Sequence, residues 1–567
     1  MLTSTRNLIN RRHPAGEKPC EGVDVTRSTR RSGAWPAVGG AVLVVSALTT
    51  RTAFAIDIQF DNPEAKASIN TTIAYGAMYR LFSASPALLY SPANSSSSDL
   101  DDGDTNFRKP GLVSNRASAL TEIQYQYGNY GFRLSGDAYY DTVYNKSNEN
   151  NSPGTVNSTS VPANRFTAAT TTTQGRNVEL DDAFVFGKFH LGAMPLNVKV
   201  GQFAQIWGET LFFGSNGIAA GMSPLDIDKL VSVPSSETKE LLIPVPQVAA
   251  TLQMIQGLSL SAYYQLGWRS DQLPPAGSFL SSADVIGQGA ESFRVGNTSF
   301  LRAPDIAGSS SGQYGAAVKY TPVNSNVDLG FYALRYNSKD PEIYLLPAST
   351  QYKLVYPEGI KLFGASFSTN LADANVAGEL SYRNNMPLVS DVQFDPTGNA
   401  NNASRPLYAV GDTLHANLSV LYSLPRSMLW PDATLTAEVG YNRLLKITAN
   451  PNALDPNTTR DALGVRLVFQ PTYYQVLPGL DLHVPIGFGY NPYGRSAVVS
   501  AFNGGAYHGG DFSIGVSGTY LAVWKFSLSY TRFLGPIAPA FNNNANYTFG
   551  QSLGDRDFVA LTLSRTF

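Results

Sequence analysis

Residues 558–567, FVALTLSRTF, end the chain and decide its expected fold class. In an extended strand, the odd positions Val559, Leu561, Leu563 and Phe567 put large apolar side chains on one face. Such an ending is typical of an outer-membrane barrel, whose last strand pairs with the first because an open edge in lipid would leave backbone groups without partners. We expect the barrel-assembly machinery to bind this strand through Phe567. Arg565 departs from the usual apolar pattern, and a soluble sandwich strand is the alternative.

The composition agrees with a membrane barrel. Of the 567 residues, 15% are charged and 11% are aromatic, which suits a sheet with one face in lipid and aromatic girdles at its rims. A net charge of -2 gives no electrostatic basis for binding nucleic acid. After residue 55, no stretch approaches the roughly 18 apolar residues of a membrane helix. The single cysteine, Cys20, excludes metal sites built on several thiolates.

Residues 1–55 are expected to be a signal peptide with an extended n-region. An apolar run over residues 35–48 follows two arginines and precedes Ala53-Phe54-Ala55, the small-x-small pattern that signal peptidase cuts. The mature chain should then begin at Ile56. The apolar run is too short for a membrane anchor, and an over-extended reading frame explains the long polar start.

Residues 56–567 are expected to form one barrel domain, because polar and apolar residues alternate throughout. In the first clear hairpin, Glu122 lies on the polar face of one strand and Arg133 and Asp137 lie on that of the next. We predict strands over residues 68–79, 118–127, 132–144, 177–191, 196–203, 247–254, 258–265, 313–321, 327–337, 361–370, 374–383, 415–424, 433–442, 462–470, 480–489, 511–520, 525–534 and 558–567. This makes about 18 strands, or 16 if two weak segments are loops.

The connections between these strands alternate in length. Short links include residues 192–195, 255–257 and 477–479, and the long ones are residues 81–117, 145–176, 204–246, 268–312, 338–360, 384–414 and 535–557. Short periplasmic turns and long external loops are typical of barrels, whereas a β-sandwich imposes no such rule. The sequence therefore predicts an all-β fold, a transmembrane antiparallel β-barrel with long external loops.

The connection over residues 204–246 carries more large apolar side chains than a loop in water should expose. Its Ser223-Pro224-Leu225-Asp226 offers a capping residue, a proline at the first helical position and an acid in the first turn, so we predict a short helix there. We expect the segment to fold into the barrel as a partly helical constriction or plug. A lid over the rim, or packing on a neighbouring subunit, is the alternative.

Several stretches resemble one protein family. They are residues 101–144, residues 179–230, residues 239–253 (KELLIPVPQVAATLQ) and the LPPAGSF segment at residues 273–279. These stretches are similar to the proteobacterial domain-of-unknown-function family DUF1302, and the similarity extends over nearly all of the mature chain. The resemblance implies an outer-membrane barrel that transfers a hydrophobic molecule across the outer membrane. It also implies a gene beside those for a periplasmic lipoprotein-like partner and an inner-membrane transporter of the resistance–nodulation–division type. It brings no established functional residues.

Two groups of side chains are candidates to line a channel. The first faces the lumen from the strands and would either form a polar path or fill the lumen with hydrated ion pairs: Glu122, Arg133, Asp137, Glu379, Arg383, Glu438, Arg443 and Arg466. The second lies in the 204–246 segment and would either contact an apolar substrate or pack within the loop: Trp207, Glu209, Phe212, Phe213, Met222 and Asp226.

Two other motifs suggest different chemistry. Asp99, Asp101, Asp102 and Asp104 resemble a calcium loop but lack its distal glutamate, so a solvated turn is the alternative. The sequence GQSLG around Ser552 matches a nucleophile elbow, which requires a strand-to-helix turn and a nearby histidine, whereas here a strand follows. We expect no cofactor, no metal and no catalysis.

The expected function is that of a porin-like, monomeric channel in the outer membrane of a Gram-negative bacterium, surrounded by its lipids. It should take up a small hydrophobic or amphipathic molecule, coupled to the periplasmic partner and the inner-membrane transporter. Three alternatives are an export duct for a lipid or secondary metabolite, an outer-membrane lipid hydrolase acting through Ser552, and a structural docking barrel with a blocked lumen.

Overall fold

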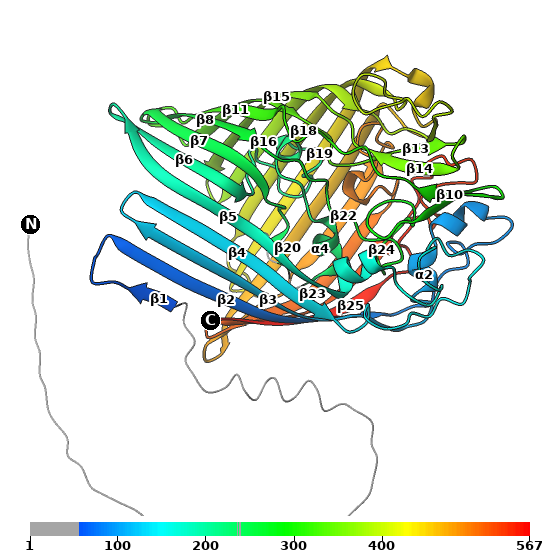
Figure 1. The fold of residues 1–567 in the computed structure, drawn as a ribbon. Coiled ribbons are helices and arrows are strands. Elements are labelled where there is room, and N and C mark those ends of the chain that lie inside the picture. Colours follow the sequence, from blue (N-terminus) through cyan, green and yellow to red (C-terminus); the bar gives the residue numbers. More distant parts are fainter. Residues whose placement is uncertain (1–55, 235, 237–239) are drawn as a thin grey trace, which may run out of the picture. The chain divides into compact units, whose positions relative to one another are not determined.

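A computed structural model describes residues 56–234, 236 and 240–567 of the protein (Figure 1). The expected signal peptide, its cleavage site and Cys20 lie outside the described residues. Over the described ranges, no helix combines the length and the apolar character needed to cross a bilayer.

A closed antiparallel barrel of 18 strands makes up most of the structure, as predicted. The alternation of polar and apolar residues favours strands, because successive side chains of a strand point to opposite faces of the sheet. The wall strands are β2 (Ala65–Arg80), β3 (Gly111–Tyr127), β4 (Tyr130–Asp141), β5 (Arg176–Leu191), β6 (Met194–Phe203), β7 (Val245–Ile255), β8 (Leu258–Gln265), β11 (Gln313–Tyr320), β12 (Val327–Tyr336), β15 (Ile360–Leu371), β16 (Ala374–Pro387), β18 (Val410–Leu424), β19 (Asp432–Ala449), β20 (Asp461–Leu477), β21 (Leu480–His483) with β22 (Ile486–Tyr493), β23 (Gly510–Tyr520), β24 (Trp524–Leu534) and β25 (Phe558–Thr566).

The last strand closes the barrel. β25 pairs with β2 from Thr566 opposite Thr72 to Phe558 opposite Arg80. β21 and β22 are two halves of one wall strand, and β1 (Ile56–Gln59) extends the edge of β2 beyond the end of β25. Closure satisfies the backbone groups of the first and last strands, which is the condition for a sheet in lipid.

The outer face of the barrel is apolar. On β12, Phe331 is exposed, whereas Tyr332 and Leu334 are buried inside. Large apolar side chains are exposed on many other wall strands, including Phe132, Leu180, Phe363, Leu418, Leu528 and Leu561. At the rim where the chain ends, the guanidinium carbon of Arg565 lies 5.0 Å from the ring centre of Trp524 and 4.7 Å from that of Phe567. These cation–π contacts explain how a charge is accommodated in the terminal strand.

The connections alternate between short and long. Turns of two to seven residues join the strands at one rim of the barrel, and nine long loops join them at the opposite rim. The loops are L1 (81–110), L2 (142–175), L3 (204–244), L4 (266–312), L5 (337–359), L6 (388–409), L7 (450–460), L8 (494–509) and L9 (535–557). Their short helices outside L3 are η1 (Ser95–Asp99), α2 (Asp102–Thr105), α3 (Ala168–Thr170), η2 (Thr171–Gly175), η5 (Pro451–Ala453) and η6 (Phe502–Gly504).

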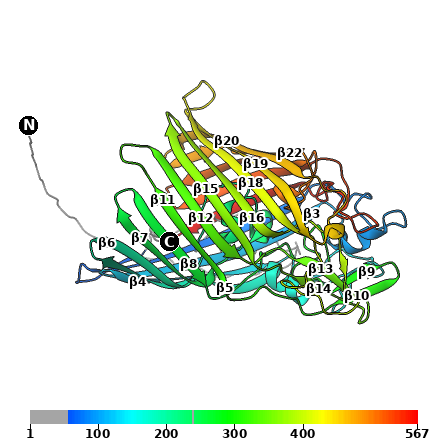
Figure 2. The same ribbon diagram turned by 90° about the horizontal axis from the view of Figure 1, so that it is seen from above.

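Three of these loops build a second sheet that the sequence analysis does not include. L4 supplies β9 (Ser292–Val295) and β10 (Thr298–Arg302), L5 supplies β13 (Glu342–Leu346) and β14 (Gln351–Val355), and L6 supplies β17 (Gln393–Phe394). These strands lie together at one end of the barrel (Figure 2). They are two to five residues long, too short to show an alternation, and pair between different loops.

Candidate functional site

L3 folds into the barrel, and its described residues include the short helices η3 (Ile218–Gly221) and α4 (Ile227–Ser232). The helix predicted near Ser223 forms, but it begins later. The side chain of Asp226 caps it by accepting a hydrogen bond from Lys229 N at 2.7 Å. Ser223 is not the cap, because its hydroxyl instead binds the backbone N and O of Gln205 at 2.8 and 3.1 Å.

Glu379 on β16 anchors L3 through backbone hydrogen bonds. Its Oε2 accepts the N–H of Glu209 at 2.8 Å. Its Oε1 accepts the N–H of Ile218 at 2.8 Å and the hydroxyl of Thr210 at 2.8 Å. The carboxylate is buried, and hydrogen bonds to a charged acceptor are about twice as strong as neutral ones. Glu379 therefore holds two separate points of L3 to one strand of the wall.

Glu438 on β19 anchors the stretch between those two points. Its Oε2 accepts the N–H groups of Leu211 at 3.1 Å, of Phe213 at 3.3 Å and of Phe212. Three successive backbone donors thus converge on one buried oxygen. This side chain faces the interior as predicted, but its charge is used to hold L3 rather than to line an open path.

Arg383 and His415 bind the next turn of L3. The guanidinium of Arg383 donates to the carbonyl oxygens of Ser215 at 3.1 Å, Asn216 at 2.8 Å and Gly217 at 2.8 Å. The Nδ1 of His415 lies 2.9 Å from Oδ1 of Asn216. Arg383 thus donates hydrogen bonds to carbonyl oxygens of L3, while Glu379 and Glu438 accept hydrogen bonds from N–H groups of L3. The wall therefore supplies both donors and acceptors to the inserted backbone.

The apolar residues of L3 pack on one sector of the interior. The indole of Trp207 lies 5.2 Å from the ring of Tyr263 and 6.0 Å from the ring of Tyr332, measured between ring centres. Met222 and Ile218 are fully buried in the same cluster, to which β7, β8, β11, β12 and β15 also contribute. This sector of the barrel is therefore apolar inside as well as outside.

Glycines in the wall make room for L3. Gly440 and Gly464 are paired across β19 and β20, and the ring of Phe213 covers both. A Cβ atom at either position would lie 2.9 Å from that ring. A Cβ atom at Gly364 would lie 2.8 Å from the side chain of Ile218. Any larger residue at these places would displace L3, because packed interiors tolerate no such overlap.

A neighbouring sector of the interior, on β4 and β5, is charged. The ammonium of Lys229 in α4 lies 3.3 Å from a carboxylate oxygen of Asp137 and 3.3 Å from one of Glu179. The pairing of β4 with β5 shifts by one residue here, a β-bulge that lets both Asp181 and Asp182 contact interior side chains. Asp137, Glu179 and Asp181 form the one group with the spacing of a metal site among the described residues, and Lys229 pairs with two of its three carboxylates.

The structure places the remaining candidate residues on both faces of the wall and within L3. Glu122 and Arg133 form an ion pair across one hairpin, and Arg466 pairs with Asp511 on β23. Arg443 is wrongly predicted to face the lumen. It is exposed beside Asp461, 3.1 Å away, since strand alternation puts it on the face opposite Glu438. In L3, Trp207, Phe213, Met222 and Asp226 are buried, and Glu209 and Phe212 are half-buried.

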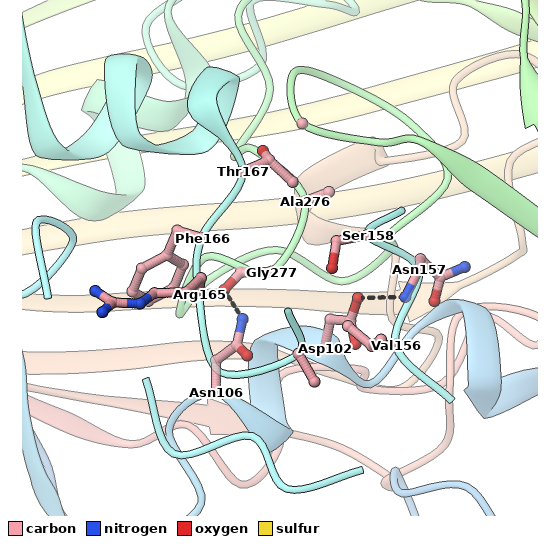
Figure 3. Close-up of a pocket in the computed structure, with 12 residues that line it drawn as sticks. Asp102, Asn106, Val156, Asn157, Ser158, Arg165, Phe166, Thr167, Ala276 and Gly277 are labelled. Atoms are coloured by element: carbon pink, nitrogen blue, oxygen red, sulfur yellow. Dashed lines mark hydrogen bonds between the residues drawn. The ribbon is translucent and has the colours of Figure 1, made fainter. Parts of the chain in front are cut away.

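The acidic run of L1 binds neighbouring loops rather than a common centre. Asp99 accepts hydrogen bonds from Arg294 N at 2.9 Å and from Asn157 Nδ2 at 2.7 Å, and Asp102 accepts one from Asn157 N at 2.9 Å. Figure 3 shows Asp102 beside L2, around a cavity of about 20 Å³ that has room for about one water molecule. The solvated turn is therefore wrong, because all four aspartates are buried, and their carboxylates do not form a group with the spacing of a metal site among the described residues.

Burial of these loop carboxyls changes their acidity. It raises the pKa of Asp99 to about 7 and that of Asp101 to about 7, since the charged form loses hydration. An unfolded aspartate has a pKa near 3.9. The folded loops therefore bind more protons than the unfolded chain between about pH 4 and 7.

This difference predicts that the protein is more stable at pH 5 than at pH 8. The proton-linked stabilisation is complete below the unfolded pKa and is lost as the pH rises through the raised pKa. The melting temperature, followed by intrinsic fluorescence, should fall between pH 5 and 8, and Asp99→Asn should reduce that fall. Asp373→Asn, in an exposed turn, is the control. An equal fall in the wild type and in Asp99→Asn would contradict the assignment.

Ser552 lacks the surroundings of a hydrolase nucleophile. It lies in a turn within L9, and β25 follows it instead of a helix. In the part of the chain that the structure describes, no histidine forms a hydrogen bond with its side chain. The geometry of a nucleophile elbow is thus missing at this motif.

Sequence reasoning missed the buried ion network that joins L1 to L9. Arg556 lies 2.8 Å from Asp104, and Arg80 lies 3.3 Å from Asp104 and 3.0 Å from Asp555. Nothing in the sequence pairs residues this far apart. The only signal is the unusual density of acidic residues in L1. If these acids are buried, cationic side chains must lie beside them.

Comparisons with known proteins place this geometry in context. A family model described as Protein of unknown function (DUF1302) matches residues 35–567. No curated protein sequence matches the chain. Among solved structures, OccAB3 of Acinetobacter baumannii is 11% identical with a TM-score of 0.41 over 88% of this chain and 99% of that one. OccAB1 of the same organism is 12% identical with a TM-score of 0.42, over 88% and 96%.

OpdK of Pseudomonas aeruginosa, solved with vanillate, is 12% identical with a TM-score of 0.38 over 88% of this chain and 98% of that one. At such scores these likenesses carry no argument about what the protein does. The family match covers the whole barrel, including L3 and the side chains that anchor it. With its model matching residues 35–567, the chain belongs to the DUF1302 family.

Proposed function

We propose that the protein is an outer-membrane channel for a small hydrophobic or amphipathic molecule, with L3 as its constriction. Closed barrels with an apolar outer face are the β-structures that lipid accepts, which supports a location in the outer membrane of a Gram-negative bacterium. No catalytic step is part of this proposal.

One observation carries the choice of substrate. L3 presents Trp207 and Met222 to an apolar sector of the interior, while Lys229 of the same loop meets the carboxylates of the neighbouring sector. Ligand sites are largely apolar with a few well-placed polar groups. A molecule with an apolar body and one polar end matches both sectors, whereas a fully polar solute would match only one.

Uptake is the proposed direction. A passive barrel has no energy source, so a periplasmic lipoprotein-like protein and an inner-membrane transporter of the resistance–nodulation–division type would draw the substrate onward. Export of a lipid or secondary metabolite would use the same path in reverse. The uptake experiment below separates the two directions.

The test measures accumulation of radiolabelled steroids, fatty acids and aromatics by cells with and without the gene. We expect slower accumulation without it, and a changed rate when residues 214–233 are deleted. Since the deletion could unfold the barrel, Glu438→Ala is the second variant. Faster accumulation without the gene would establish export. No change for any compound, together with no ion conductance even after the deletion, would overturn the proposal in favour of a docking barrel.

A further inference from the structure

The barrel wall has a step beside β5. β5 pairs with β4 up to Arg176, but its pairing with β6 begins only at Ala183, opposite Gln202. Residues 176–182 therefore have no strand on their second side among the described parts of the chain. The Gln202 side chain covers part of this edge, donating to the carbonyl oxygens of Leu180 at 2.9 Å and Asp181 at 2.8 Å. Unpaired edges are normally protected, so an open one needs an explanation.

The outer face of the step is apolar at Val178 and Leu180 and ends at the exposed Arg176. Val178 and Leu180, on the outer face of the unpaired segment, are 81% and 55% exposed. Tyr140, on the outer face of the neighbouring β4, is also exposed. Lipid that covers this face of β5 therefore reaches the edge beyond which β6 is missing.

A cavity of about 250 Å³ lies behind that edge. Leu180 and Asp181 of β5 line it on one side, and Leu242, Ile243 and Pro244 at the end of L3 line it on the other. Lys229 of α4 lines its inner part. The cavity thus extends from Leu180, which faces outward, to Lys229, which faces the interior. Its walls are the unpaired edge of β5 and the end of L3, rather than two paired strands.

The lining of the cavity selects the polar end of a ligand. Its carboxylates outnumber its cations, with Glu179, Asp181, Asp226, Asp228 and Glu240 against Arg116, Lys229 and Arg269. A cationic or hydrogen-bond-donating group is favoured over an anion by this balance. The volume is below the roughly 300–1,000 Å³ of sites that enclose a whole drug-sized ligand, so only a polar end would be enclosed.

We propose that this step is a lateral port between the outer membrane and the barrel interior. An amphiphile with an apolar body and one cationic or neutral donor end crosses the wall here, its polar end in the cavity and its body against Val178 and Leu180. The inference rests on the proposed channel function and adds the route and the substrate class.

The first test asks whether lipid reaches the cavity. Single cysteines at Asp181, at Thr436 and at Leu561, in a Cys20→Ser background, are labelled with bimane and placed in nanodiscs of brominated-acyl phosphatidylcholine. Leu561 is on the outer face, which contacts lipid. Thr436 faces the barrel interior from β19, a strand that is paired on both sides. We expect the label at 181 to be quenched nearly as strongly as that at 561. Quenching as weak as at 436 would overturn the port.

The second test separates the port from the channel. Cells lacking the gene carry the wild type, Leu180→Trp to fill the port, or Leu561→Trp as a control on the outer face. Tracer dodecylamine, dodecanol and dodecanoate are the probes. We expect Leu180→Trp to slow dodecylamine uptake about tenfold, which corresponds to roughly 1.4 kcal/mol added to the barrier. Its ion conductance in bilayers should match that of the wild type.

Each outcome bears on a different claim. Uptake by Leu180→Trp at the wild-type rate overturns the port but leaves the channel. Preference for dodecanoate over dodecylamine overturns the substrate class. Wild-type cells that take up none of the three probes faster than cells without the gene overturn the channel itself, even if the quenching test shows that lipid reaches position 181.

Discussion

Replacing Glu438 with alanine is expected to raise the ion conductance of the barrel in a planar lipid bilayer. Its carboxylate is the buried acceptor for the N–H groups of Leu211, Phe212 and Phe213, and alanine would leave all three without it. Each buried donor left without its acceptor costs about 1–3 kcal/mol, so the three N–H groups together cost about 3 kcal/mol or more. Since 1.4 kcal/mol is about a tenfold change in an equilibrium, the released form of L3 should become at least about a hundredfold more populated.

Single-channel recording would show this as frequent openings to a larger conductance. Glu438→Gln keeps a neutral acceptor of the same size and should give an intermediate result. Thr436→Ala, two residues away on the same face of β19, is the matched control and should conduct like the wild type. If Glu438→Ala folds normally and its conductance does not change, L3 is not the constriction.

Replacing Arg556 with methionine is expected to destabilise the protein strongly. The guanidinium is 1% exposed and lies 2.8 Å from Asp104, so methionine would fill its space but leave that carboxylate short of a cation. Breaking a buried ion pair in this way should lower the free energy of unfolding by about 3–5 kcal/mol. Arg80 would remain beside Asp104 and keep the loss from being larger.

Urea unfolding followed by tryptophan fluorescence would measure the change. Arg532→Met is the matched control, because the Arg532 side chain is 61% exposed and lies 3.9 Å from Asp557. An exposed pair contributes only about 0–1 kcal/mol, so this variant should unfold almost as the wild type does. Equal destabilisation by the two substitutions would show that burial of the Arg556 network is not what stabilises the loops.

Much of the wall could be predicted from the sequence because the information is local. An alternation of period two, bounded by turn residues, identifies each strand and its inner and outer faces. It placed Glu379 and Glu438 inside, and the terminal strand showed that the sheet had to close. Two predictions of this kind are wrong: the lumenal placement of Arg443 contradicts its own alternation, and the helix cap is Asp226 rather than Ser223.

The candidate site was predicted only as a set of residues, without their partners. L3 was identified because its apolar content could not remain in water. That Glu379 would bind Ile218, or that Gly440 and Gly464 would receive Phe213, has no local signal. Each of these contacts joins segments more than a hundred residues apart.

Local residue patterns are thus enough to predict the barrel, its approximate strand count, its two faces and the loop that enters it. Contacts between distant segments establish which charges hold L3, that three external loops share a sheet, and that β6 ends before it reaches the first residues of β5. The difference lies in the distance along the chain over which each interaction acts. Side-chain alternation acts between neighbouring residues, whereas the register and closure of the sheet bring distant strands together, and short polar contacts then depend on that three-dimensional arrangement.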